Sequence, residues 1–461
     1  MPFRAKFAAR FEKSLKHWFK DQHFRSLLRN SSYLGISRAV AAVAGVATLA
    51  FAGRGLGVLL FGTLILITSY AKAVSGIAKF QSWQLIVRYG GHGVAHGDPE
   101  HFKVATGFAF ALDLISGIGG MLVGAALLPF IGTLVGIRPE YLWLGILYCT
   151  LLPTMASATP GGVLRVLDRF DLMGWSDTAT PISRAILSGI AFVSHASFPV
   201  YVAVWYVTDL GGDLFNWFLG WRELKRHRLH VGIRPTLRPN ALPGAWRFAI
   251  EVNLATSVQA VWGPIGRLVV GGLLGPAGAA LFRIASTLAD SAQKPADLLG
   301  KAFYPEIMRM DLSSKKPWKL MVRGTALISA VALFAIGLML IGGRPLMSLL
   351  FGSAFLGAYK PLVILMAIPF IGIFGFPLSP MLYALGRSDG PLKAKLLGSA
   401  VFFVTIAPLS WAFNVVGAAI ALVLANVVNA AAMMIMLRAE HRRVRSGSAA
   451  QAAILNSSQP R

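Results

Sequence analysis

Long apolar stretches, separated by short basic ones, dominate this sequence and constrain its fold more than any other feature. The mean hydropathy is +0.62, and only 14% of the 461 residues are charged. An ordinary soluble domain has roughly a quarter of its residues charged. Because a helix needs about 20 apolar residues to cross the hydrocarbon core of a bilayer, these stretches are predicted to be membrane spans. The expected fold class is an all-α membrane protein.

The apolar stretches predict about twelve transmembrane helices. Few residues separate the fifth span from the sixth. The predicted spans are 32–53, 58–80, 104–130, 140–158, 179–197, 200–221, 246–270, 277–300, 324–343, 358–384, 392–411 and 415–437.

Basic residues are concentrated in alternate connections between the predicted spans. The formal net charge is +25, yet the odd-numbered connections contain little beyond Arg54, Arg138 and Arg344. Cytoplasmic loops of membrane proteins carry such an excess of Lys and Arg. The charge therefore indicates membrane orientation rather than a nucleic acid partner. It predicts an even number of spans in a bacterial inner membrane, with both termini in the cytoplasm.

A basic segment near the middle of the chain divides the spans into six and six. Each half begins on the cytoplasmic side, so the halves have the same orientation. Substrate sites of transporters built from such parallel repeats lie between the repeats, near the midplane. The predicted parts are a basic amphipathic cytoplasmic segment (1–30), an N-terminal six-helix lobe (31–222), a basic cytoplasmic linker (223–244), a C-terminal six-helix lobe (245–437) and a cytoplasmic tail (438–461).

Short glycine-rich motifs lie at the predicted hairpins. Span one is followed by Arg54-Gly-Leu-Gly-Val-Leu-Leu-Phe-Gly62, and span seven by a turn from Leu274-Gly275 to Phe282-Arg283. Further motifs are Thr159-Pro160-Gly-Gly-Val-Leu164-Arg165, Pro305-Glu306-Ile-Met-Arg309 and Leu350-Phe351-Gly352-Ser-Ala-Phe355. Together they resemble those of the polysaccharide-transport (Wzx-type) flippases. This family belongs to the multidrug/oligosaccharidyl-lipid/polysaccharide (MOP) superfamily, with the MATE multidrug extruders and the lipid II flippases.

The resemblance implies a V-shaped bundle of two six-helix lobes around a central cavity, working by alternating access. The implied cargo is an undecaprenyl-pyrophosphate-linked oligosaccharide for lipopolysaccharide or exopolysaccharide biosynthesis. Expected partners are this lipid-linked oligosaccharide, anionic membrane lipids and the polysaccharide polymerase or export machinery.

Ionisable side chains within the spans are the candidate binding residues. Each costs about 2.5–3.5 kcal/mol at the centre of a membrane helix, so such groups are expected to face a cavity or a partner. The predicted cavity residues are Arg283, Lys72, Arg267 and Arg38. A cationic cavity suits a pyrophosphate, because arginine binds phosphate oxygens with two parallel hydrogen bonds and lysine adds a point charge.

Two of these four residues also have a structural explanation. Arg38 lies near a cytoplasmic end, from which its side chain can extend to the headgroups, and Arg267 would fit the outer interface. Asp113 and Asp290 are candidates for coupling to a proton or sodium gradient, because a buried carboxylate without a partner can take up a proton. Alternatively, Asp113 pairs with a cavity arginine and Asp290 neutralises Lys294. Glu251 is expected to pair with Arg247, four residues earlier.

Two other functions compete with the flippase. A cation-coupled small-molecule exporter on the same scaffold would expose carboxylates in its cavity. A saccharide polymerase or ligase usually carries a large outer loop with catalytic residues, whereas the outer connections here are short. No nucleotide-binding motif is present. The sequence therefore predicts a transporter rather than an enzyme, with no catalytic residues, metal or cofactor and with proton or sodium coupling left open.

Overall fold

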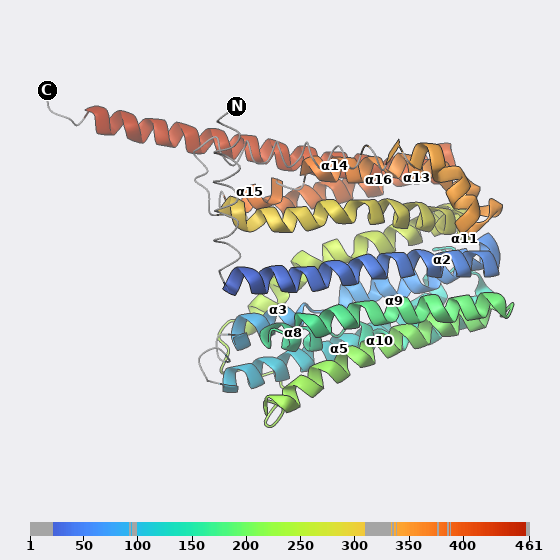
Figure 1. Cartoon of the computed structure of the whole chain (residues 1–461), viewed down its shortest axis with the longest axis horizontal. Coiled ribbons are helices and arrows are strands. Elements are labelled where there is room, and N and C mark those ends of the chain that lie inside the picture. The colour runs from blue at the N-terminus through green and yellow to red at the C-terminus, as the bar shows by residue number, and fades with distance from the viewer. Residues whose placement is uncertain are drawn as a thin grey trace, which may run out of the picture.

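The computed structural model describes residues 22–91, 94, 99–308, 333, 336–337, 339–375, 378–384, 387 and 389–457. Regular structure in this part of the chain is entirely helical (Figure 1), which confirms the predicted fold class. Most of the predicted ninth span, 324–343, and most of the predicted amphipathic segment, 1–30, lie outside the described residues. Only the backbone is described for several helical segments, among them 22–38 and 293–308.

Three very long helices each contain a sharp break. They are α2 (Gln22–Ala78), α11 (Ala245–Met308) and α16 (Gly390–Ser457). At 1.5 Å per residue, even the shortest would be more than twice as long as the ~30 Å hydrocarbon core if it were straight. The backbone leaves helical geometry at Gly57 (φ 69°), Gly275 (φ 71°) and Asn414 (φ 54°). The chain turns back at these breaks, so each long helix is a hairpin of two spans (Figure 1).

The remaining helices of the N-terminal lobe follow α2. They are α3 (Ser82–Leu85), the π-helix η1 (Ile86–Gly90), α5 (Pro99–Ile131), the 3-10 helix η2 (Pro139–Tyr141), α6 (Leu142–Cys149), α7 (Leu152–Met155), α8 (Thr159–Val166), α9 (Phe170–Val193) and α10 (Phe198–Arg226). The stretch from η2 to α8 is bent by 50° at residues 150–151, so the predicted fourth span is broken rather than straight.

The C-terminal lobe begins with α11. It continues through a short helix at Met339–Phe351, η3 (Ser353–Ala358), α13 (Tyr359–Leu365), α14 (Ala367–Gly375) and α15 (Leu378–Ala384), and ends with α16. The predicted tenth span is thus divided among α13, α14 and α15. Helix α10 extends four residues beyond the predicted start of the linker, which leaves 227–244 between the lobes.

Hydropathy alone identifies fewer spans than the fold contains. Within the described residues, five helices are long and apolar enough to cross a membrane, or six if the bent pair is one span. Three of the five contain a hairpin break, so each of them belongs to a long helix that makes two crossings. They are Ala39–Gly90, Gly263–Ala292 and Gly390–Glu440. Helices α9 and α10 are long enough but are not in this apolar set. They carry Arg184 and Asp209, which belong to the polar site described below.

The two ends of the bundle differ in character. The breaks at Gly57 and Gly275 and the turn between α9 and α10 lie at one end, which we call the hairpin end (Figure 1). The linker 227–244, the start of α2 and the end of α16 lie at the other, which we call the basic end (Figure 1).

The lobes touch closely at the hairpin end, where α2 packs against α11. A Cβ atom on Gly62 would lie 1.9 Å from the carbonyl oxygen of Pro276, and one on Gly272 would lie 2.4 Å from that of Leu134. The rings of Phe61 and Phe355 meet edge to face, with centroids 5.8 Å apart. This end of the interface between the lobes is therefore closed.

Candidate functional site

A cavity of about 140 Å³ lies between the N-terminal lobe and α11. Both halves of α2, together with α9 and α10, line it from one side, and both halves of α11 from the other. Four basic side chains converge on it: Lys72, Arg184, Arg267 and Arg283. Because they come from four separate spans, only the tertiary fold brings them together.

Arg267 links the two lobes across this cavity. Its Nε donates a 2.8 Å hydrogen bond to Ser69 Oγ on the second half of α2. Its guanidinium also interacts electrostatically with the charged side chains of Arg283 and Asp290. The predicted alternative, that Arg267 sits at the outer interface, does not fit its position on the cavity wall.

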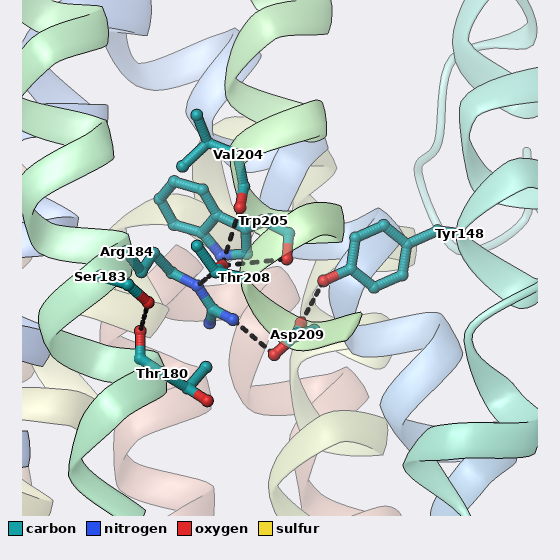
Figure 2. A network of polar contacts seen from close by, with 8 residues as sticks. All are labelled: Tyr148, Thr180, Ser183, Arg184, Val204, Trp205, Thr208 and Asp209. Atoms are coloured by element: carbon teal, nitrogen blue, oxygen red, sulfur yellow. Dashed lines mark hydrogen bonds and ion pairs between the residues drawn. The ribbon is translucent and has the colours of Figure 1, made fainter. Parts of the chain in front are cut away.

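Arg184 belongs to a hydrogen-bonded network between α9 and α10 (Figure 2). Its guanidinium forms an ion pair with Asp209, and its Nε donates to Thr208 Oγ1 at 2.8 Å. The Tyr148 hydroxyl donates to the other oxygen of Asp209. The side chains of Arg184 and Asp209 are only 13% and 14% exposed. The network therefore fixes the guanidinium in place and occupies both oxygens of the carboxylate.

The charge balance at the cavity is positive. Four cations line it, and three carboxylates interact with them. Asp209 acts on Lys72 and Arg184, Asp213 acts on Lys72, and Asp290 acts on Arg267 and Arg283. Hydroxyl groups of Thr48, Thr68, Ser69 and Thr287 make up most of the remaining polar lining. Such a surface has hydrogen-bond donors suited to phosphate oxygens.

The structure brings together three of the four predicted cavity residues: Arg283, Lys72 and Arg267. The side chain of Arg38 lies outside the described residues, as does that of Lys294, the predicted partner of Asp290. Arg184 was not among the predicted cavity residues. Its position within the fifth span was the one available signal, and the sequence does not reveal that Asp209 and Thr208 hold it toward the cavity.

Asp113 is buried away from the cavity and is fully hydrogen-bonded. Its Oδ1 accepts from the Ser82 hydroxyl at 2.7 Å. Its Oδ2 accepts from the Ser157 and Thr159 hydroxyls and from the backbone N–H groups of Ala158 and Thr159, all at 2.7–3.0 Å. These donors surround the N-terminus of α8, where unpaired N–H groups favour a negative charge. This carboxylate therefore has partners, and none of those hydrogen-bond donors is an arginine.

Two further charged groups can be placed. Glu251 and Arg247 form the predicted ion pair, with 2.7 Å between Oε1 and Nε. Lys79, which shares a helical face with Lys72, does not reach the cavity. Its ammonium group donates instead to the carbonyl oxygen of Met155 at 3.1 Å.

Comparison with known proteins identifies the family. No protein family model matches the sequence. The inner membrane protein YghQ of Escherichia coli (strain K12) is 41% identical over 348 residues, which cover 75% of this chain and 98% of that protein. The chain belongs to the YghQ family. Together with the apolar helices, this relationship makes it a multi-pass inner membrane protein.

Solved structures show that this YghQ-family protein has the fold of MOP superfamily transporters. An inward-facing multidrug resistance MATE transporter matches with a TM-score of 0.67 at 15% identity, covering 90% of this chain and 95% of the other. The lipid II flippase MurJ in an inward closed conformation also gives 0.67, at 10% identity, and covers 93% of both chains. The fold expected from the hairpin motifs is thus confirmed, whereas membership of the polysaccharide-transport family remains a prediction.

Proposed function

We propose that this protein is a flippase that moves an anionic, lipid-linked oligosaccharide across the inner membrane by alternating access. An undecaprenyl-pyrophosphate carrier serving lipopolysaccharide or exopolysaccharide synthesis is the cargo we favour. The observation that carries the proposal is the convergence of Lys72, Arg184, Arg267 and Arg283 on one cavity between the lobes. Uncompensated charge is costly inside a membrane, so an excess of cations at the interface between the lobes favours an anionic ligand.

The four cations would contribute differently to pyrophosphate binding. Arg267 and Arg283 offer planar guanidinium groups that can bind phosphate oxygens in pairs, and Lys72 adds a point charge. Arg184 is already paired with Asp209, so it contributes less free charge. The cavity of about 140 Å³ is smaller than the roughly 300–1,000 Å³ of ordinary ligand sites. A saccharide can therefore enter only if the two lobes move apart, and alternating access provides this motion.

The orientation of the cycle follows from the basic residues. We assign the basic end and both termini to the cytoplasm, because Lys and Arg are enriched in cytoplasmic connections. The hairpin end, where Gly62 meets Pro276, then faces the periplasm and is closed. This arrangement corresponds to a state that would receive cargo from the cytoplasmic side.

A cation-coupled small-molecule exporter is the alternative, and the fold does not separate the two. The MATE transporter and the MurJ flippase match with the same TM-score of 0.67. Cavity charge favours the flippase. An exporter of organic cations needs an accessible carboxylate in its cavity. None of the residues that line this cavity is a carboxylate, and both oxygens of the neighbouring Asp209 are engaged by Arg184 and Tyr148.

The decisive experiment measures flipping of a fluorescent undecaprenyl-pyrophosphate saccharide in proteoliposomes that contain the full chain. The double variant Lys72→Ala/Arg283→Ala removes two cavity cations and should slow flipping by at least about tenfold, since hydrogen bonds to charged groups contribute about 1.5–3 kcal/mol each. Arg138→Ala is the matched control, because Arg138 is exposed and pairs only with Glu140 among the contacts described for it. Wild-type rates in the double variant, at equal protein content, would refute the proposal. So would transport of a cationic dye that the saccharide does not inhibit.

A further inference from the structure

A second hollow lies in the N-terminal lobe and is almost wholly apolar. It encloses about 390 Å³ and shares no lining residue with the cationic cavity. Helices α5, α8 and α10 form its walls, and the linker 227–244 contributes Ile233 and Pro235. We call it the tryptophan groove and define it by Phe110, Pro160, Trp217, Trp221, Ile233 and Pro235.

The walls of the tryptophan groove are held in place by specific contacts. Phe110 of α5 and Trp217 of α10 pack edge to face, with ring centroids 5.3 Å apart. A Cβ atom on Gly220 would lie 3.1 Å from Pro160, so α10 and α8 approach closely. The linker is fixed over α5, because a Cβ atom on Gly107 would lie 2.2 Å from the carbonyl oxygen of Arg234. The hollow is thus a feature of the packed lobe rather than a gap beside a loose loop.

The mouth of the groove is cationic. Trp221 is 45% exposed, and the Lys225 ammonium lies 5.9 Å from the centre of its ring. Arg234 is exposed and stands between the lining residues Ile233 and Pro235. The adjacent carboxylate, Glu223, is fully buried and points to Arg169, with Oε2 2.7 Å from its Nη1. None of the lining residues is charged. The groove therefore has basic side chains at its mouth and an uncharged, largely apolar interior.

We propose that the tryptophan groove binds one acyl chain of an anionic phospholipid, whose phosphate lies between Lys225 and Arg234. The apolar lining and the volume of about 390 Å³ suit a chain. The cations at its mouth select the headgroup charge, and tryptophan with lysine or arginine is the usual composition of a membrane interface. The bound lipid would fasten the linker between the lobes to α5 and α10. This site is separate from the transport cavity and does not depend on which cargo is carried.

Native mass spectrometry of the full chain, titrated with phosphatidylglycerol or phosphatidylcholine, tests the selectivity. The wild type should retain phosphatidylglycerol in preference to phosphatidylcholine. Each Lys or Arg near an anionic lipid strengthens binding by about fivefold. Lys225→Gln/Arg234→Gln should therefore weaken phosphatidylglycerol binding roughly 25-fold. The control Arg138→Gln/Arg247→Gln removes the same charge from two exposed ion pairs and should leave binding unchanged.

Quenching of tryptophan fluorescence by brominated acyl chains tests the location. Brominated phosphatidylglycerol should quench the wild type more than brominated phosphatidylcholine does, and Trp217→Phe/Trp221→Phe should abolish that difference. Trp143→Phe/Trp411→Phe is the control, because both side chains are exposed elsewhere, 56% and 73%. Equal quenching by the two lipids would overturn the proposal. So would an excess that persists without Trp217 and Trp221, or displacement of the phospholipid by equimolar undecaprenyl phosphate.

Discussion

Asp113 shows how single side chains in this fold stabilise a buried charge without a hydrogen-bonded counter-ion. Five donors contact its two oxygens, and two of them are backbone N–H groups at the start of α8. Charge-assisted hydrogen bonds of this kind are about twice as strong as neutral ones. They join α5 to α3 and α8. We infer that the carboxylate positions these helices rather than carrying a coupling proton, although the sequence made both roles reasonable.

The substitution Asp113→Asn tests this structural role. The new amide group would place N–H donors against the hydroxyl and backbone donors that now bind the carboxylate, so the variant should lose about 2–3 kcal/mol of stability. Thermal unfolding in detergent measures the loss. Glu140→Gln is the control, because that carboxylate is 57% exposed. An Asp113→Asn protein with normal stability but no dependence of transport on a proton or sodium gradient would instead support coupling.

At the scale of elements, the hairpins were predictable and their packing was not. Glycine readily adopts positive φ, so the glycine-rich motifs predicted breaks where Gly57 and Gly275 now lie. No such motif accompanies the break at Asn414. The sequence indicated its position only because one apolar stretch ends there and another begins. The approach of Gly62 to Pro276 depends on how α2 and α11 rotate about their axes. Residue spacing within one helix does not specify that rotation.

This close approach makes a prediction about conformational state. In Gly62→Ala the added methyl group would overlap the Pro276 carbonyl, which lies 1.9 Å from the Cβ position. The lobes must move apart at the hairpin end, and a cost of about 1.4 kcal/mol to the closed state would shift the equilibrium tenfold toward opening. Spin labels at Ser194→Cys and Ser353→Cys should report a longer distance by electron paramagnetic resonance.

The control for this measurement is Gly119→Ala, since nothing lies within 4 Å of that Cβ position. The buried Cys149 is the only natural cysteine and is replaced by alanine in every labelled protein. If Gly62→Ala and Gly119→Ala give the same distance distribution, then glycine packing does not hold this end closed.

For the whole molecule, hydropathy and charge predicted the architecture better than the site. The all-α fold and the positions of three hairpins followed from where apolar stretches begin and end. Helices α9 and α10 weaken that signal, because the same polar side chains that build the Arg184–Asp209 network lower their hydropathy. Three predicted cations reached the cavity, since a charge within a span must face something other than lipid. The pairing of Arg184 with Asp209 joins two helices, so no spacing along the chain revealed it.

The orientation of the whole bundle in the membrane is the remaining prediction, and it follows from charge alone. Because the basic end carries the linker 227–244, a cysteine at Arg228 should face the cytoplasm, whereas one at Ser194, in the turn between α9 and α10, should face the periplasm. Both positions are exposed. An impermeant maleimide should label Ser194→Cys in intact cells with a permeabilised outer membrane, and Arg228→Cys only in inverted vesicles. Cys149 is buried, so the unsubstituted protein is the background control. Labelling with the opposite sidedness would place the closed hairpin end in the cytoplasm and reverse the proposed direction of transport.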